Sequence, residues 1–168
     1  RQTVAATQPV ATIIGDSLVR VSRFLGHEVT TDNHIGDWGT QFGIIIHGWK
    51  TILDQEALDA NPSTELLRVY KALNDQIKAE DGTATITICR QELVKLQQGD
   101  EENLAIWKRC VDLSLNSLAN VYRLLDVSFD HYLGESFYND ALAPLVKKLK
   151  ADGIARESAG AICIFSDG

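Results

Sequence analysis

The stretch Asn33-His34-Ile35-Gly36-Asp37-Trp38-Gly39-Thr40-Gln41-Phe42-Gly43 packs three glycines, an acid, an indole, a histidine and an amide into eleven residues. Glycines let a backbone approach a ligand closely. Asp37 suits a cationic amine or guanidinium through charge-assisted hydrogen bonds, and Trp38 offers a flat face to a cation or base. We call residues 33–43 the glycine-rich loop. Its composition indicates a ligand site, although a tight structural turn with Trp38 as a core anchor explains it equally well.

A helix and a short strand are predicted immediately before the glycine-rich loop. Apolar residues recur at helical spacing between Thr12 and Phe24, and Gly26 suits the end of that helix. The run Glu28–Thr31 contains β-branched residues and predicts a short strand that leads into the loop. Helix, turn, strand and loop form half of a Rossmann-type unit, in which ligands bind at the carboxyl ends of strands.

The middle of the chain is predicted to be a helical insertion. Apolar spacing predicts four helices, over Gln41–Leu58, Ser63–Lys78, Arg90–Gln97 and a long stretch after Asp100. Asp100 suits the N-cap of the last of these. The segment Thr83–Cys89 stays ambiguous, because it alternates like a strand but lies between helices.

The predicted organisation changes at Asp126. We expect a strand at Val127–Asp130, an amphipathic helix at Phe137–Ala151 that ends at Asp152-Gly153, and two short strands within Ile154–Phe165. The sequence therefore predicts an α/β fold with a helical insertion. Its expected parts are residues 1–42, 43–125 and 126–168.

Composition and charge narrow the class of protein. The chain has 168 residues, and 45% of them are hydrophobic. Its net charge of −7 disfavours binding of nucleic acid through overall electrostatic attraction to the phosphates. No apolar run is long enough to span a membrane. Cys89, Cys110 and Cys163 are widely spaced, so we interpret them as small apolar residues and not as metal ligands or a disulfide. This interpretation fits the reducing cytoplasm. Because the sequence contains no methionine, we expect it to be incomplete.

The glycine-rich loop resembles the signature loop of arginyl-tRNA synthetases, a class I family. Other segments resemble that family in the same order along the chain, from Thr12 to Phe165: residues 13–18, 24–29, 96–100, 107–108, 129–136 and 157–161. The match of several motifs in one order is far more specific than any one of them. The expected fold is therefore part of a class I synthetase catalytic domain of Rossmann type, with a helical insertion.

The resemblance also implies a reaction and its partners. Arginine and ATP would form arginyl-adenylate with release of pyrophosphate, Mg²⁺ would carry part of the phosphate charge, and tRNA(Arg) would then accept the arginyl group. The expected arginine and adenylate pocket contains His34, Gly36, Asp37, Trp38 and Gln41. No protein metal site and no membrane are implied. Three simpler roles stay open: Asp37 as the cap of the following helix, Trp38 in the core, and His34 bonded to backbone.

The sequence also departs from the resemblance. Class I enzymes carry a His-x-Gly-His motif that contacts ATP, expected just before Thr12. Here Ala5–Ala11 reads Ala-Ala-Thr-Gln-Pro-Val-Ala, and no histidine precedes His27. A Lys-Met-Ser-Lys-Ser-type loop and an anticodon-binding domain are not found either. The alternative function is therefore an incompetent fragment or inert nucleotide-fold module with weak tRNA contact. Exposed apolar faces on the insertion helices would predict self-association.

Overall fold

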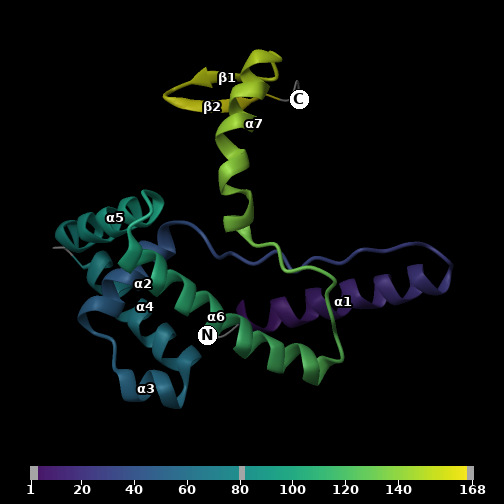
Figure 1. Cartoon of the computed structure of the whole chain (residues 1–168), viewed down its shortest axis with the longest axis horizontal. Coiled ribbons are helices and arrows are strands. Elements are labelled where there is room, and N and C mark those ends of the chain that lie inside the picture. The colour runs from purple at the N-terminus through teal and green to yellow at the C-terminus, as the bar shows by residue number, and fades with distance from the viewer. Residues whose placement is uncertain (1–3, 80–81, 166–168) are drawn as a thin grey trace.

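The structure is a computed structural model that describes residues 4–79 and 82–165, with side chains from residue 10 onward. Most of these residues are helical (Figure 1). The elements are α1 (Val4–Phe24), α2 (Thr40–Thr51), α3 (Gln55–Ala60), α4 (Pro62–Lys78), α5 (Thr83–Gln97), α6 (Glu101–Leu125), the 3₁₀ helix η1 (Glu135–Tyr138), α7 (Asn139–Ala151), β1 (Ala155–Ser158) and β2 (Ala161–Ile164). Within these residues, no helix has the length and apolar character needed to cross a membrane.

Helices α2 to α6 pack together and form the bundle (Figure 1). Its buried core contains the following apolar side chains: Phe42, Ile46, Leu58, Leu66, Val69, Leu73, Cys89, Leu96, Ile106 and Cys110. Two glycines of α2 allow its close contacts. A Cβ on Gly43 would collide with the Cys89 carbonyl of α5, and a Cβ on Gly48 would collide with Val69 of α4. The predicted helical insertion is thus a real packing unit.

A buried polar network also ties the bundle together. The Lys50 Nζ atom lies 2.9 Å from Glu92 Oε2 and 2.6 Å from Asn103 Oδ1, and the fully buried Asn103 donates its amide to the Glu92 carbonyl at 2.8 Å. Burial alone would raise the pKa of Glu92. Hydrogen bonds from Lys95, Lys50 and Asn103 outweigh burial and lower that pKa to about 2.

The helix boundaries in the bundle follow the predictions with two changes. Asp100 caps α6 as predicted, because its Oδ1 accepts the Asn103 N–H at 3.0 Å. The prediction of one helix over Gln41–Leu58 is wrong, since Asp54 caps a separate helix, α3. The ambiguous Thr83–Cys89 is helical. Its helix buries Cys89, Glu92 and Leu96 at spacings of three and four residues, so the helical period extends through it.

The predicted strands at Glu28–Thr31 and Val127–Asp130 are wrong. The structure assigns no strand to these residues, and an isolated parallel bridge joins Asp32 and His131, the residues that directly follow the two segments. They nevertheless run side by side, because the Asn33 N–H donates to the His131 carbonyl at 2.9 Å and the His131 N–H donates to the Thr31 carbonyl at 3.0 Å. We call residues 31–37 and 130–136 the parallel pair. Two segments without further neighbours make too few ladder bonds to count as a sheet.

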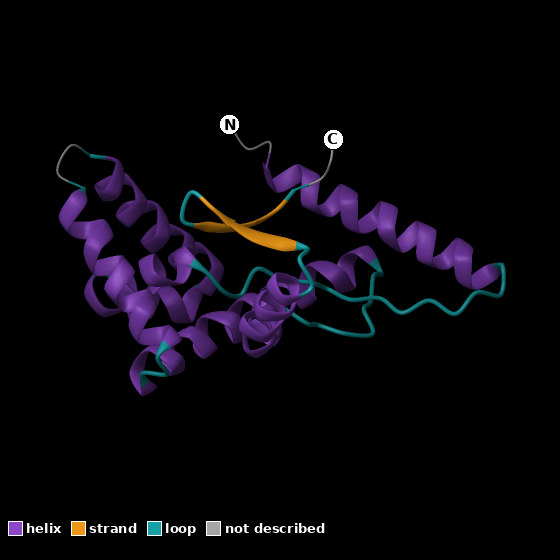
Figure 2. Ribbon diagram, turned by 90° about the horizontal axis from the view of Figure 1, so that it is seen from above, coloured by secondary structure: helices purple, strands orange, loops and turns teal. Residues whose placement is uncertain are grey.

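The C-terminal part projects from the rest as a helix and a hairpin (Figure 1), and Figure 2 shows the two strands of that hairpin from above. The predicted helix Phe137–Ala151 is divided between η1 and α7, and it ends before Asp152-Gly153 as expected. The two predicted strands within Ile154–Phe165 are confirmed as β1 and β2. They pair antiparallel, with Ala155 opposite Ile164 and Ser158 opposite Ala161.

Helix α1 begins at Val4, eight residues before the predicted start, and extends away from the bundle (Figure 1). Charged side chains attach it: Arg20 reaches Asp126, and Arg23 bonds Asp130 Oδ2 at 2.9 Å. Its apolar side chains are exposed, namely Val10, Ile13, Ile14, Leu18, Val21 and Phe24. We call these six residues the α1 stripe. The structure thus has one packed region, the bundle, and one open region, which consists of α1, the parallel pair, α7 and the hairpin.

Candidate functional site

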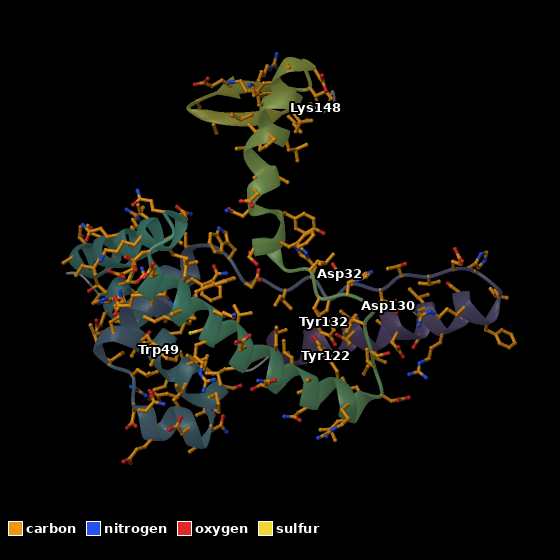
Figure 3. All side chains as sticks on the ribbon, in the orientation of Figure 1. Asp32, Trp49, Tyr122, Asp130, Tyr132 and Lys148 are labelled. Atoms are coloured by element: carbon orange, nitrogen blue, oxygen red, sulfur yellow. The ribbon has the colours of Figure 1, made fainter. Side chains whose placement is uncertain are left out.

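A cavity of about 430 Å³ lies where the glycine-rich loop meets α1, α2 and α6. Residues 33–37 line one part of it. The helices contribute the remaining lining residues: Ala11, Thr12, Phe42, Val111, Ser114, Leu115, Leu118 and Tyr122. Figure 3 shows Asp32, Tyr122, Tyr132 and Asp130 gathered near this junction, while Trp49 lies in the bundle and Lys148 on the projecting α7. The cavity has the size and the mixed polar and apolar lining of a small-ligand site.

The parallel pair fixes the loop residues that line the cavity. Its contacts join residues about 99 apart in the sequence, and they continue beyond the backbone bridge. The Leu133 N–H donates to Asp32 Oδ1 at 2.9 Å, and the Glu135 N–H donates to the Ile35 carbonyl at 3.0 Å. The cavity wall is therefore held by a segment that follows the whole bundle in the sequence.

Asp37 ends this series of contacts. Its side chain is buried, at 7% exposure, and both carboxylate oxygens accept hydrogen bonds from Ser136. The Ser136 N–H lies 2.8 Å from Oδ1 and the Ser136 Oγ lies 2.6 Å from Oδ2. Helix α2 begins at Thr40, inside the glycine-rich loop, and its N-cap Gly39 makes no side-chain bond, so Asp37 does not cap it. Instead, the Asp37 carboxylate accepts its hydrogen bonds from Ser136, in the first turn of the short helix η1.

The backbone of Asp37 contacts α6. Its carbonyl accepts the Trp107 indole N–H at 2.6 Å, and the Trp107 ring meets Trp38 edge to face at 5.6 Å. Trp38 also packs against the bundle core, which fits the core role that the sequence left open. Neither Trp38 nor Gln41 lines the cavity. The Gln41 Nε2 donates to the Trp38 carbonyl at 2.7 Å and so holds the loop from behind.

His34 and Gly36 line the cavity beside Asp37. The His34 Nδ1 lies 2.8 Å from the Leu133 carbonyl, and a carbonyl only accepts, so we assign the proton to Nδ1. In the neutral ring Nε2 is then a hydrogen-bond acceptor. The ring also lies 5.8 Å from Tyr138. At Gly36 an added Cβ would meet only Glu135, at 4.0 Å, so the space beside this glycine is open.

Among the polar cavity residues that were not singled out from the sequence, Asn33 and Tyr122 are bonded to each other. Asn33 donates its side-chain amide to the Tyr122 hydroxyl at 3.1 Å, across 89 residues of sequence, and Tyr122 stacks edge to face on Phe129 at 5.1 Å. Tyr122 lies within the long helical stretch predicted after Asp100, and its position there follows the apolar face of α6. A polar hydroxyl on an otherwise apolar face was the available signal for it. Asn33 gave no signal beyond its place in the loop.

The described part of the chain gathers no group of three or more His, Cys, Asp or Glu residues that could hold a metal ion. Mg²⁺ is usually held by one or two carboxylates together with substrate phosphates rather than by an all-protein cage. The residues around the cavity thus offer no set of ligands through which a metal-dependent step can be derived.

Comparison with known proteins places these features in a family. A family model described as tRNA synthetases class I (R), catalytic domain, matches residues 6–168. The arginine–tRNA ligase of Fusobacterium nucleatum is 47% identical over 157 residues, and that of Lactococcus lactis strain IL1403 is 40% identical over 159. These alignments cover 94% and 92% of this chain but 27% of each relative.

A solved structure gives the same result. The arginyl-tRNA synthetase from Plasmodium falciparum matches with a TM-score of 0.66 and 30% identity, over 93% of this chain and 26% of that one. The chain therefore spans about a quarter of the length of the proteins it resembles.

Proposed function

Because the chain belongs to the class I (R) tRNA synthetase catalytic-domain family, we propose that it forms the arginyl-adenylate half-site of an arginine–tRNA ligase. The family match confirms the predicted fold class, a partial class I synthetase catalytic domain. The division into residues 1–42, 43–125 and 126–168 stays a prediction. The observation that carries the proposal is the cavity formed by the glycine-rich loop, α1 and α6.

In the proposed reaction a carboxylate oxygen of L-arginine attacks the α-phosphorus of ATP. The new P–O bond forms as the bond to pyrophosphate breaks, and the arginyl group later passes to tRNA(Arg). Mg²⁺ bound with ATP would supply phosphate-charge neutralisation. The residues of this chain would contribute by positioning, which is a large part of the rate in such displacements.

We propose that His34 and Gly36 border the ligand, since they line the cavity, and that Asp37 belongs to the same cavity wall. The His34 Nε2 would accept a hydrogen bond from a hydroxyl or ammonium group of the ligand. Gly36 would admit the ligand close to the backbone. Trp38 and Gln41 would act from behind the loop, through their contacts with Trp107 and with each other.

Titration with a non-hydrolysable arginyl-adenylate analogue tests the proposal by calorimetry, with the lysyl-adenylate analogue as control. Selective binding of the arginyl compound is expected, and His34→Ala should weaken it about tenfold by removing the proposed acceptor. No heat with either compound, from a chain shown to be folded by circular dichroism, would contradict the half-site.

A second candidate is a chain that binds the adenylate but does not make it. It is favoured by the segment Ala5–Ala11, which lies in α1 where the resemblance implies the ATP-contacting histidines. Incorporation of labelled pyrophosphate into ATP, with arginine and tRNA(Arg) present, distinguishes the two. Exchange above background supports activation by this chain, and binding without exchange supports the second candidate.

The open region suggests that this chain has partners. Its accessible surface is 11946 Å², whereas a compact monomer of 18.5 kDa has about 8,200 Å². Obligate interfaces take about 1,000–2,500 Å² from each partner, so the roughly 3,700 Å² of additional surface on this chain is more than one such interface would cover. We propose that the remainder of the ligase covers the α1 stripe in a full-length protein, and that the isolated chain self-associates through it. The insertion helices, predicted to carry this surface, expose only scattered apolar side chains.

The proposed location is the cytoplasm, where the ligase would meet tRNA. The cysteines fit a reducing compartment: Cys89 and Cys110 are free and buried, and Cys163 is free and partly exposed.

A further inference from the structure

We propose that Asp37 is a positioning residue, which shapes the cavity through a clamp with Ser136 and does not bind the ligand by its charge. The inference rests on the proposed function, because it concerns how the same cavity holds an arginyl-adenylate. It differs from the expectation raised by the sequence, in which the Asp37 carboxylate would meet a cationic group directly.

The first support is that Ser136 already engages both oxygens of the carboxylate. The Ser136 N–H donates to Oδ1 at 2.8 Å and the Ser136 hydroxyl donates to Oδ2 at 2.6 Å. A carboxylate that is 7% exposed has little surface left for a guanidinium or ammonium group. A ligand cation would have to displace bonds to charged oxygen, which are among the stronger hydrogen bonds in proteins.

The second support is the fit of Gly134 against the same carboxylate. A Cβ placed on Gly134 would lie 2.5 Å from Asp37 Cγ and Oδ1 and 2.6 Å from Oδ2. The φ of Gly134 is −73°, so its backbone conformation is open to any residue. Close approach of the Asp37 carboxylate therefore accounts for a glycine here, which is what a built clamp requires.

The third support is the place of the clamp in the wall of the cavity. Contacts with α6 fix the loop at two points, where Asn33 meets Tyr122 and where the Asp37 carbonyl meets Trp107. The Asp37–Ser136 bonds tie the same wall to the segment that leads into α7. Losing them would loosen the Asp37 end of the cavity wall, while the contacts of Leu133 and Glu135 with the loop and both α6 contacts stay in place.

The decisive variants separate charge from hydrogen bonding. Asp37→Asn removes the charge but keeps the clamp, because the amide oxygen accepts from the Ser136 N–H and the amide nitrogen donates to the Ser136 hydroxyl. Asp37→Ala removes both bonds. Gly134→Ala leaves Asp37 and Ser136 intact but pushes the carboxylate away from its seat. Gly15→Ala is the matched control, because an added methyl meets nothing within 4 Å there.

Two measurements are made on each folded variant of the whole chain: affinity for the arginyl-adenylate analogue, and hydrogen exchange of the Ser136 amide without ligand. We expect Asp37→Asn and Gly15→Ala to stay within about threefold of the original chain in both. We expect Asp37→Ala and Gly134→Ala to lose about tenfold in affinity and to exchange the Ser136 amide about tenfold faster.

Equal loss of affinity in Asp37→Asn and Asp37→Ala, with the Ser136 amide still protected in Asp37→Asn, would overturn the inference in favour of a charge contact. Unchanged Ser136 exchange in Asp37→Ala would overturn it as well, because no clamp would exist. A chain that binds no analogue at all refutes the half-site, and hydrogen exchange still decides whether the clamp exists.

Discussion

The bundle of α2 to α6 and the open region made of α1, the parallel pair, α7 and the hairpin are held together in different ways. Among the described residues, every buried apolar side chain except Val127 and Ala155 belongs to the bundle. The open region depends on charged contacts such as Arg23–Asp130 and on backbone bonds of the parallel pair. The bundle thus has a core of its own, whereas the open region leaves the α1 stripe exposed.

The largest expected effect is on the free energy of unfolding, which should fall far more for a truncation in the bundle core than for one on α1. Ile46 is fully buried, so Ile46→Ala should lower the free energy of unfolding by about 2–5 kcal/mol in urea titration. The matched change Leu18→Ala lies on the exposed α1 stripe and should cost less than about 0.5 kcal/mol. Similar losses at both positions would show that α1 is packed as well as the bundle.

The second effect is the pH dependence that the polar network gives to the bundle. The pKa of Glu92 is about 2 in the folded chain, below its ordinary 4.5, so its stabilisation is present above pH 4.5 and is lost as pH falls toward 2. Glu92→Gln should lose about 1–3 kcal/mol at pH 7, and its unfolding free energy should change less between pH 5 and 3 than that of the original chain.

The control for the network is Glu101→Gln, an exposed acid in the first turn of α6. It should keep the acid dependence of the original chain. If Glu92→Gln and Glu101→Gln have the same pH profile, the network does not stabilise the bundle through the Glu92 charge.

A smaller effect concerns the start of α6, the helix that belongs to the bundle and also lines the cavity. Asp100→Ala removes the bond to the Asn103 N–H and should cost about 1 kcal/mol in the same urea titration. Glu101→Ala changes the charge at the adjacent position without removing a cap, and a few tenths of a kcal/mol are expected. Equal costs would indicate that charge near the helix end matters more than the capping bond.

The smallest change in stability is expected on the α1 stripe, where the readout is association. The pair Leu18→Glu and Val21→Glu should alter the free energy of unfolding by less than about 0.5 kcal/mol but abolish concentration-dependent sedimentation. The control pair Leu67→Glu and Val94→Glu adds the same charge to isolated exposed positions of α4 and α5. Loss of association in both pairs would point to net charge and not to the α1 stripe.

Local periodicity predicted the helices because each carries its own signal. The apolar stripe of α4 and that of α6 each lie within a single helix, and the cap at Asp100 directly precedes α6. The predicted strands failed because a strand depends on its neighbours. Val127–Asp130 has the β-branched and aromatic residues that strands favour. In the described structure, however, its backbone bonds on the strand side go only to the segment at Thr31. The hairpin succeeded because β1 and β2 supply each other with a partner.

The loop that lines the cavity was singled out from the sequence, but the contacts that hold it were not. Glycine spacing identified the loop, and the cavity does contain His34, Gly36 and Asp37. Whether they bind arginine or adenylate stays a prediction. The partners of Asn33 and Asp37, which are Tyr122 and Ser136, lie 89 and 99 residues further along the chain. No local pattern encodes a contact over such distances, so composition alone could not tell a ligand carboxylate from a clamp.

The parallel pair also has a consequence for the order in which the chain folds. Its two segments close a loop of about a hundred residues, and closing a loop costs more entropy the longer its flexible part is. Contacts between helices that follow each other in the bundle are far more local and form faster. Once the bundle has formed, the ends of that loop are already near each other and little flexible chain separates them. We therefore expect the cavity wall to assemble after the bundle, on helices that are already folded.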